Sequence, residues 1–370
     1  MPKRTRMYQL FPNQPGVTKG RLALLGLTGA LALHSSVAMA ASDVCGPDSA
    51  YKQAPSTISL RVDNDMFGAN GQDQGYTNGV KLSWISPNLA SYVDDPCLPG
   101  PARAINRYLT WLQPSGFEQQ NMVMSLSHGL FTPQDHTRSD LIEDDRPYAA
   151  ALLASFGFNA RTGNELHATH LSLGVVGRAA LGKPLQDAVH SITGSDNFKG
   201  WDHQLHNEPV FLLAHERMFR FPGSSQRNDW GWDAITHVGA GVGNLATYAN
   251  VGGEIRYGFR IPDDFGSTPL RLAGENTAPS RTYSKNSGWS GHLFASLNGK
   301  AVLRDITLDG NTFRSSHSVD KRPFVADIGY GLSISYDEWK LTVARYHRTR
   351  EFRGQSETPV FGSVTLSRQF

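Results

Sequence analysis

The sequence predicts an all-β fold, a twelve-stranded antiparallel transmembrane β-barrel with a short helix in an extracellular loop. Three observations carry this prediction: an export signal at the N-terminus, apolar residues that alternate with small or polar ones, and a last strand that ends in Phe370. No window after the export signal holds 18 consecutive apolar residues, so no transmembrane helix is expected. Alternation over about ten residues is the sequence signal of a barrel that spans the outer membrane.

The composition excludes several other classes of protein. The 370 residues include 35 Lys and Arg and 33 Asp and Glu, which gives a formal net charge of +2. This balance argues against a strongly basic nucleic-acid binder. The two cysteines are too few for a Cys-rich zinc module or a disulfide scaffold.

Residues 1–40 are typical of a secretory signal peptide. Basic residues precede the apolar run Leu22–Leu33, and the small-residue sequence Val37-Ala38-Met39-Ala40 follows it as a cleavage site. The run is too short to cross a bilayer as a helix. We therefore expect residues 41–370 to be the exported part of the chain, an outer-membrane β-barrel.

Alternation defines twelve strands in order along the chain. Ile58, Leu60 and Val62 alternate with polar residues in the first, and Val80 and Leu82 do so in the second. The expected strands are residues 56–66, 76–86, 120–131, 147–159, 166–177, 204–220, 231–243, 251–260, 289–303, 322–336, 339–350 and 359–370. The even number places both termini in the periplasm and the connections 67–75, 132–146, 178–203 and 304–321 outside.

Alternation by itself leaves two architectures open. A soluble sandwich turns its apolar face inward, whereas a membrane barrel turns it outward. The C-terminus favours the barrel, because Val364, Leu366 and Phe370 share one phase and resemble the terminal strand that the bacterial barrel-assembly machinery reads. Arg368 departs from that pattern, but near the interface its charged head can extend into water.

Two short helices are expected in the connections, and a third connection, 261–288, is expected to be an irregular loop. Ala102–Leu112 falls on the periplasmic side, either at the membrane surface or at the rim of the barrel. Pro184–Ile192 falls in an outer loop, with Leu185 and Val189 on its apolar side.

The two cysteines fit the same topology. Cys45 precedes the first strand and Cys97 follows the second, so both lie on the periplasmic side, where disulfides persist. We expect a structural disulfide between them, with two unpaired thiols as the alternative.

Two clusters of residues are candidates for a metal site and for a catalytic base. Asn64 and Asp65 end the first expected strand, and Thr77 opens the second. An antiparallel hairpin brings the oxygen atoms of these residues together. Hard oxygen donors of this kind suit Ca²⁺. Gln186 and His190 are four residues apart and share one face of the expected outer helix. An imidazole is a good general base near neutral pH. The plain alternatives are a polar hairpin loop and a surface histidine.

Several motifs in a fixed order carry a resemblance to one family. They are Leu60-Arg61-Val62-Asp63-Asn64-Asp65, Tyr76-Thr77-Asn78-Gly79, Phe131-Thr132-Pro133, Asp145-Arg146-Pro147-Tyr148-Ala149, Gln186-x-x-x-His190 and Gly200-Trp201-x-x-Gln204-Leu205-x-Asn207. Together, over residues 56–370, they resemble the outer-membrane lipid A 3′-O-deacylases of the LpxR type. The resemblance implies a twelve-stranded barrel and a Ca²⁺-dependent esterase whose active site lies between the barrel wall and an outer-loop helix.

The resemblance also implies roles for single residues. It makes His190 the catalytic base and places Asn64, Asp65 and Thr77 at the catalytic centre and around the metal. Asp196 stands where the family has a glutamate near the metal, one methylene longer. Asn64 shares the phase of the apolar residues, so the site is expected to open sideways to the outer leaflet. Thr77 falls in the other phase, so its backbone is expected to matter more than its hydroxyl.

Substrate contacts and partners complete the expectation. Arg146, Gln186 and Lys183 are expected to bind lipid A, the lipid anchor of lipopolysaccharide, in the bacterial outer membrane. We expect a monomer that depends on the barrel-assembly machinery and binds no nucleic acid. Two alternatives stay open: a porin-like or binding barrel without catalysis, and an outer-membrane phospholipase.

Overall fold

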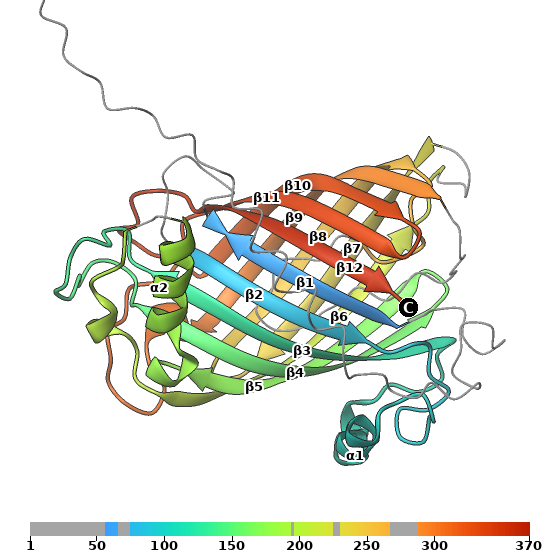
Figure 1. Ribbon diagram of the computed structural model, residues 1–370, viewed down its shortest axis with the longest axis horizontal. Helices are drawn as coiled ribbons and strands as arrows, with labels where there is room; N and C mark the ends of the chain where they lie inside the picture. Colours follow the sequence, from blue (N-terminus) through green and yellow to red (C-terminus); the bar gives the residue numbers. More distant parts are fainter. Residues whose placement is uncertain (1–55, 66–74, 194–195, 225–229, 267–287) are drawn as a thin grey trace, which may run out of the picture. The chain divides into compact units, whose positions relative to one another are not determined.

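A computed structural model of the chain describes residues 56–65, 75–193, 196–224, 230–266 and 288–370. Within these ranges twelve antiparallel strands pair in sequence order, and β1 closes the barrel by pairing with β12 (Figure 1). The predicted twelve-stranded all-β barrel is therefore confirmed. No helix in the described part of the chain is long and apolar enough to cross a membrane. The predicted signal peptide and Cys45 lie outside the described residues.

The strands match the twelve predicted segments in order. They are β1 Thr57–Asn64, β2 Gly75–Ile85, β3 Gln119–Thr132, β4 Ala149–Thr162, β5 Glu165–Val176, β6 Glu208–Phe221, β7 Trp230–Val242, β8 Ala246–Phe259, β9 Trp289–Asp305, β10 Phe324–Tyr336, β11 Trp339–Arg348 and β12 Val360–Gln369. The helices are α1 Gly100–Tyr108, α2 Gly182–Thr193 and α3 Ile306–Asp309, with short 3₁₀ turns η4 Thr110–Leu112, η5 Arg178–Ala180 and η6 Trp201–His203. β6 begins four residues later than expected, after the turn η6 and a short irregular segment of residues 204–207.

The exposure of alternating residues in the strands shows which way the apolar residues point. Leu82 and Leu126 are 50% and 55% exposed, whereas Lys81 and Ser83, which alternate with Leu82, are buried. The apolar set therefore faces outward and the polar set lines the lumen. This is the arrangement of a membrane barrel and the reverse of a soluble sandwich.

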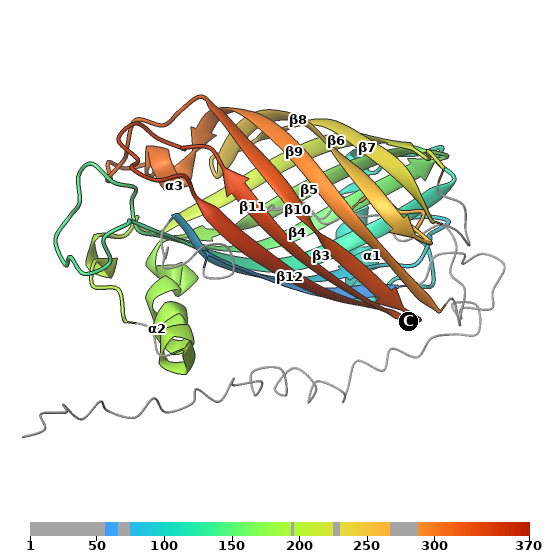
Figure 2. The ribbon, with the colours of Figure 1, turned by 90° about the horizontal axis from the view of Figure 1, so that it is seen from above.

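Exposed aromatic residues gather at one end of the barrel. We call this the C-terminal end, because β12 ends there, and it lies opposite α2 (Figures 1 and 2). The exposed Trp and Tyr residues of the strands at this end, which we call the aromatic girdle, are Trp230, Trp232, Tyr257, Trp289, Tyr336 and Trp339. Trp289 and Tyr336 pack with ring centroids 4.7 Å apart. Such girdles mark the membrane interface of outer-membrane barrels.

Side chains fill the lumen. Tyr76 of β2 packs edge-on against Phe361 of β12, with ring centroids 5.7 Å apart. The same buried cluster includes Leu153 of β4 and Phe294 of β9. Since these strands lie on different sides of the barrel, the cluster bridges the lumen.

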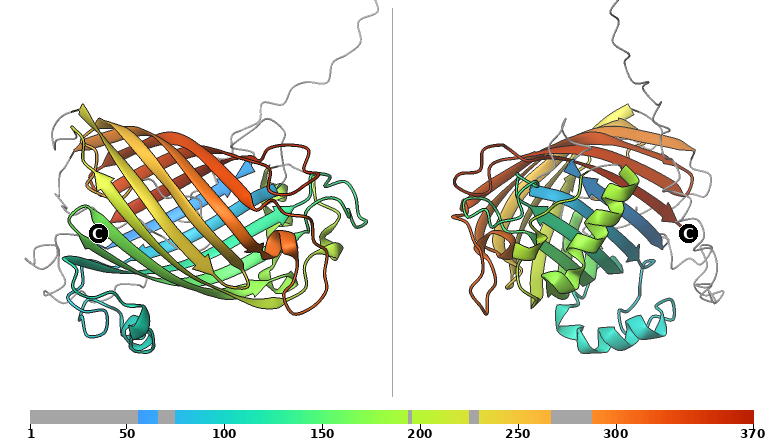
Figure 3. Two further views of the ribbon diagram at one scale, coloured as in Figure 1. Left: turned by 180° about the vertical axis from the view of Figure 1, so that it is seen from behind. Right: turned by 60° about the vertical axis from the view of Figure 1, so that its left-hand side comes forward.

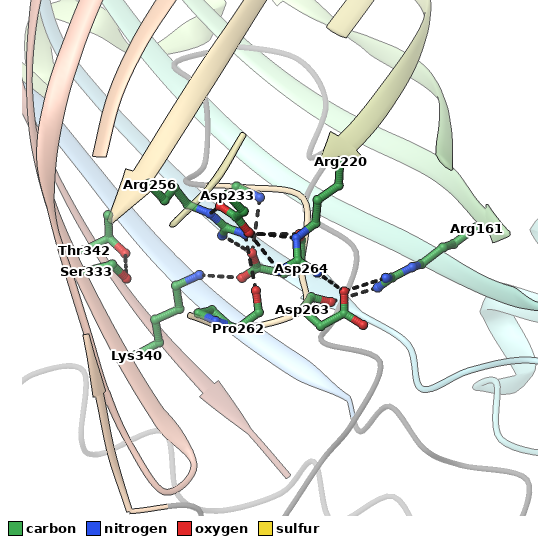
Figure 4. Close-up of polar contacts among 11 residues, drawn as sticks. Arg161, Arg220, Asp233, Arg256, Pro262, Asp263, Asp264, Ser333, Lys340 and Thr342 are labelled. Atoms are coloured by element: carbon green, nitrogen blue, oxygen red, sulfur yellow. Dashed lines mark hydrogen bonds and ion pairs between the residues drawn. The ribbon is translucent and has the colours of Figure 1, made fainter. Parts of the chain in front are cut away.

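An ion network crosses the lumen nearer the C-terminal end (Figure 4). Asp264, just after β8, binds Lys340 of β11 at 2.9 Å and Arg256 of β8. Its neighbour Asp263 binds Arg161 of β4 at 2.7 Å and Arg220 of β6. The described start of the connection predicted as a loop thus turns back into the lumen.

Candidate active site on the outer wall

Helix α2 lies outside the barrel wall at the end opposite the C-terminal end. Figures 1 and 3 both show it across the ends of β1 to β4. The loop that carries it buries Ala180, Phe198 and Trp201 against Leu130 of β3 and Ala150 of β4. Leu130 and Leu126 are four residues apart and so share the outward phase of β3. The loop therefore covers the membrane-facing side of the wall at this end.

Close backbone approach fixes where α2 begins. A Cβ atom on Gly182 would lie 2.6 Å from Cβ of Ala150 and 2.7 Å from the Trp201 ring. Only glycine lets the helix start this near to β4. On the neighbouring strand, Nε2 of His128 and the carbonyl oxygen of Ala180 are hydrogen-bonded at 2.7 Å. Together these contacts attach the start of the helix to β3 and β4.

The inward face of α2 is its polar face. Gln186 and His190 are 1% and 5% exposed, while Leu181 and Leu185 on the outer side of the loop and helix are exposed. The sequence correctly placed Gln186 and His190 on one face. Val189 on the predicted apolar side is half-buried, whereas Leu185 is exposed and does not pack on the barrel as it would in a soluble domain. It faces the surroundings of the barrel, which are lipid in a membrane.

His190 is held in one tautomer by a backbone carbonyl. Its Nδ1 lies 2.7 Å from the carbonyl oxygen of Asp196. A carbonyl only accepts, so Nδ1 carries the proton and Nε2 is the basic nitrogen of the neutral ring. The ring of Phe198 packs edge-on against the imidazole, with centroids 5.3 Å apart. The Asp196 side chain is exposed, so the contact to His190 uses only its backbone.

Gln186 is oriented by Trp201. The indole Nε1–H donates to Oε1 of Gln186 at 2.6 Å, and both side chains are buried. An indole only donates, so this contact fixes which amide atom is the oxygen. Nε2 of Gln186 is buried and has no hydrogen-bond partner among the described residues. Its N–H groups are therefore suited to donate to an oxygen of a bound molecule.

The ends of β1 and β2 contribute oxygen donors on the same side of the wall. Asn64 pairs directly with Asn78 across the two strands, and it shares the phase of the exposed Ile58. Asp65 follows Asn64 and is buried. Asn64 thus lies on the outward side, as the sequence predicted, and it ends β1. Figure 1 shows this end of β1 at the end of the barrel that α2 crosses.

The prediction that the Thr77 hydroxyl lies in the opposite phase was wrong. The pairing of β2 with β3 shifts register between Tyr76 and Asn78, which makes Thr77 the extra residue of a β-bulge. The Thr77 hydroxyl lies 2.5 Å from that of Thr132, and Thr132 shares the outward phase of Leu126. The bulge also turns Tyr76 into the lumen.

These donors suit a hard cation. No group of three or more His, Cys, Asp or Glu side chains is placed to hold a metal in the described ranges. A cation here would instead use the amide of Asn64, the carboxylate of Asp65 and an oxygen of Thr77. An all-oxygen set of this kind fits Ca²⁺.

The two predicted substrate cations lie in different surroundings. Arg146 is buried, with Nη1 3.0 Å from Glu351 and Nη2 3.2 Å from the Thr307 hydroxyl. Its charge is already balanced inside the barrel rim. Lys183 is exposed on α2 and pairs with Asp187 at 2.7 Å. Of the two, only Lys183 stands at the surface.

Several residues at the site carried no role in the sequence prediction. Phe198 packs on His190, Trp201 orients Gln186, and Thr132 meets Thr77. Trp201 belongs to a quoted motif, so a signal for it existed. No sequence signal marked Phe198, because its contact with His190 depends on how the loop folds back. Away from the site, Cys97 is disulfide-bonded.

The chain is similar to several known proteins. A family model described as outer membrane protein LpxR matches residues 27–370. The solved structure of LpxR from Salmonella typhimurium is similar, with a TM-score of 0.67 and 17% identity over 85% of this chain and 100% of that chain. The β domain of the Bordetella autotransporter Brka covers 86% of this chain and 100% of that one, at 10% identity and a TM-score of 0.41. No curated protein matches the chain.

Proposed function

Because the chain belongs to the LpxR family of outer-membrane proteins, we propose that it is a Ca²⁺-dependent lipid A 3′-O-deacylase. This is a carboxylic ester hydrolase that removes the acyl chain esterified at the 3′ position. Outer-membrane barrels carry their long loops outside and short turns in the periplasm. The end with α2 would then face the outer leaflet, where lipid A lies. A monomeric state and assembly by the barrel-assembly machinery stay predictions.

The orientation of His190 is the observation that carries the proposal. The hydrogen bond from Nδ1 to the Asp196 carbonyl leaves Nε2 as the basic atom, on the face of α2 that turns toward the wall. A positioned imidazole of this kind accelerates hydrolysis by about 10²–10⁴-fold as a general base. Burial against Phe198 keeps the ring in this position.

The proposed reaction uses these groups in sequence. Nε2 of His190 takes a proton from water as the water oxygen attacks the ester carbonyl. The N–H groups of Gln186 donate to an oxygen of the bound ester. The imidazolium then returns the proton to the sugar oxygen as the C–O bond breaks, which yields a fatty acid and a free 3′-hydroxyl. When bound by Asn64, Asp65 and Thr77, Ca²⁺ would polarise the carbonyl and stabilise the negative oxygen.

The surroundings of the site fit a substrate that arrives within the membrane. Leu181 and Leu185 are exposed beside the site, and Asn64 shares the phase of the outward apolar residues. A lipid could therefore reach His190 sideways along the outer wall, without entering the lumen. In this proposal Lys183, which is exposed on the same helix, binds a phosphate or sugar oxygen of lipid A.

The porin alternative is disfavoured by the filled lumen. Tyr76, Phe294 and Phe361 belong to one buried cluster that bridges several strands, and the ion network lies beyond it. The phospholipase alternative differs only in substrate. A test of the proposed function therefore compares hydrolysis of lipid A with hydrolysis of a glycerophospholipid.

The experiment incubates the purified barrel in detergent micelles with hexa-acylated lipid A or with a glycerophospholipid, with Ca²⁺ or with a chelator. We expect release of the 3′-linked fatty acid from lipid A only, and only with Ca²⁺. Release from the glycerophospholipid alone would establish the phospholipase. No release from either lipid by a correctly folded barrel would contradict the proposed hydrolase.

A further inference from the structure

The connection between β2 and β3 covers the outside of the barrel near its C-terminal end. Leu89, Leu98 and Leu112 are buried in one cluster with Met122 of β3 and Phe158 of β4. Met122 is four residues from Leu126 and so shares its outward phase. Figures 1 and 3 show α1 outside the ends of β3 to β5. The connection that carries α1 thus packs on the outward face of the wall at this end.

Hydrogen bonds hold α1 in one orientation. Asn106, in the last turn of the helix, is fully buried and donates to the carbonyl oxygen of Tyr92 at 2.6 Å. The Tyr92 hydroxyl donates in turn to the carbonyl oxygen of Asn159 in β4 at 2.9 Å. Since Asn106 faces the barrel, the opposite side of α1 faces away from it.

That opposite side carries aromatic and basic residues. Ala104, Arg107, Tyr108 and Trp111 are exposed and follow one another at helical spacing, with Trp111 in the turn η4. Tyr108 is 83% exposed and Trp111 65%. Arg107 and the half-buried Arg103 are the only charged residues between positions 96 and 117. Aromatic rings beside arginines on a helix are typical of a membrane–water interface.

The position of α1 coincides with a gap in the aromatic girdle. The girdle residues belong to β7–β11, whereas strands β3, β4, β5 and β6 contain no Trp or Tyr. Trp and Tyr hold a barrel at its depth in the bilayer by placing their polar edges at the headgroups. On the side of β3 to β5, the exposed Trp and Tyr near this end come from α1 and η4.

We propose that α1 and η4 lie in the headgroup region of the bilayer surface at the C-terminal end, the periplasmic leaflet in the proposed orientation. Tyr108 and Trp111 supply interfacial aromatic residues beside β3 to β5, where the strands carry no Trp or Tyr. Arg103 and Arg107 approach the phosphates of anionic phospholipids. The partner of this surface is therefore a phospholipid bilayer, continuous with the membrane that surrounds the strands.

The test uses the full barrel inserted in phospholipid vesicles that contain brominated lipids, which quench nearby tryptophan. The fluorescence of Trp111 is the difference between the wild type and Trp111→Phe. A helix that lies about 5–10 Å into the headgroup boundary would be quenched more by bromine high in the acyl chain than by bromine near its end. Aqueous iodide would quench it weakly. Insertion in either direction gives the same result, because α1 meets the nearer leaflet.

Trp339→Phe, which removes a girdle tryptophan, is the matched control, and its difference signal should show the same depth preference. Circular dichroism verifies that both variants fold. In a second arm, anionic lipid should increase the quenching of Trp111, and Arg103→Gln/Arg107→Gln should abolish that increase. A Trp111 signal that bromolipids leave unchanged and iodide quenches strongly would overturn the proposal, because α1 would then face water.

Discussion

At the scale of single residues, a backbone atom of Asp196 holds His190, whereas the resemblance implied a role for the Asp196 side chain near the metal. The Asp196 carbonyl fixes His190, while the Asp196 carboxylate is exposed. A carboxylate one methylene shorter than the family's glutamate therefore leaves the orientation of the imidazole intact.

This geometry predicts different activities for two variants. Asp196→Ala keeps the carbonyl and should retain most deacylase activity, whereas His190→Ala should lose about 10²–10⁴-fold through loss of the general base. Initial rates of fatty-acid release at several Ca²⁺ concentrations measure both. An Asp196→Ala enzyme that needs much more Ca²⁺ would instead make the carboxylate a metal ligand, as the resemblance implied.

The conformation around the bulge at Thr77 also requires a glycine at position 79. A Cβ atom there would lie 1.7 Å from the hydroxyl of Tyr76, which the bulge turns into the lumen. Gly79→Ala should destabilise the barrel by roughly 1–3 kcal/mol, the usual cost of overpacking. Urea unfolding in vesicles measures this. Gly299→Ala is the control, since its nearest atom would be 3.8 Å away, and equal losses in the two variants would refute the packing argument.

Sequence patterns predict the orientation of a site residue only where the helix or strand that carries it is regular. Gln186 and His190 were placed correctly because helix spacing sets their shared face. Thr77 was misplaced because one extra residue in a strand reverses the phase, and no local signal marked it. Phe198 escaped notice because its contact with His190 depends on long-range loop packing.

At the scale of elements, α2 is an amphipathic helix with its polar face inward. Leu185 faces outward because the barrel wall at this place adjoins lipid, which makes an exposed apolar side favourable. The helix spacing was predictable, but the side that packs on the wall depends on the surrounding solvent. For α1 the sequence left the position open for the same reason.

The rim loops depend on a buried ion cluster. Glu351 binds Arg146 at 3.0 Å and Arg348 at 3.1 Å, all three being nearly inaccessible. Burial raises the pKa of Glu351, but the charges of Arg146 and Arg348 outweigh it and hold the pKa below its usual value. Its stabilisation is therefore complete above the unfolded-state pKa of about 4.3 and is lost as pH falls through the lower folded value.

Glu351→Gln should cost about 3–5 kcal/mol at neutral pH, because it leaves buried guanidinium charge without this carboxylate. Asp320→Asn, which breaks an exposed pair with Arg353 at 3.3 Å, should cost about 0–1 kcal/mol. Urea unfolding between pH 7 and pH 3 measures both. If Glu351→Gln lost as much stability with acid as the wild type, the carboxylate would not be the titrating group.

At the scale of the whole molecule, the closed barrel followed from alternation, but the contents of its lumen did not. The turn of Asp264 toward Lys340 and Arg256 joins strands far apart in sequence, so no local pattern signals it. Together with the buried cluster that contains Phe294, this network fills the lumen.

A filled lumen predicts the absence of a pore. The purified barrel in planar bilayers should give no steady single-channel conductance above that of the lipid, since the cluster around Phe294 and the ion network at Asp264 obstruct the passage. A matched trimeric porin provides the positive control. Reproducible open channels from the barrel would revive the porin alternative.

The most direct test of the central claim is mass spectrometry of lipid A from a Gram-negative strain without its own deacylases. The strain expresses either the wild-type barrel or His190→Ala, with insertion into the outer membrane verified for both. We predict that the wild type removes a mass equal to the 3′-linked acyl group and that His190→Ala leaves lipid A unchanged. The same mass loss with both proteins would contradict the account, because the ester would then be cleaved without His190.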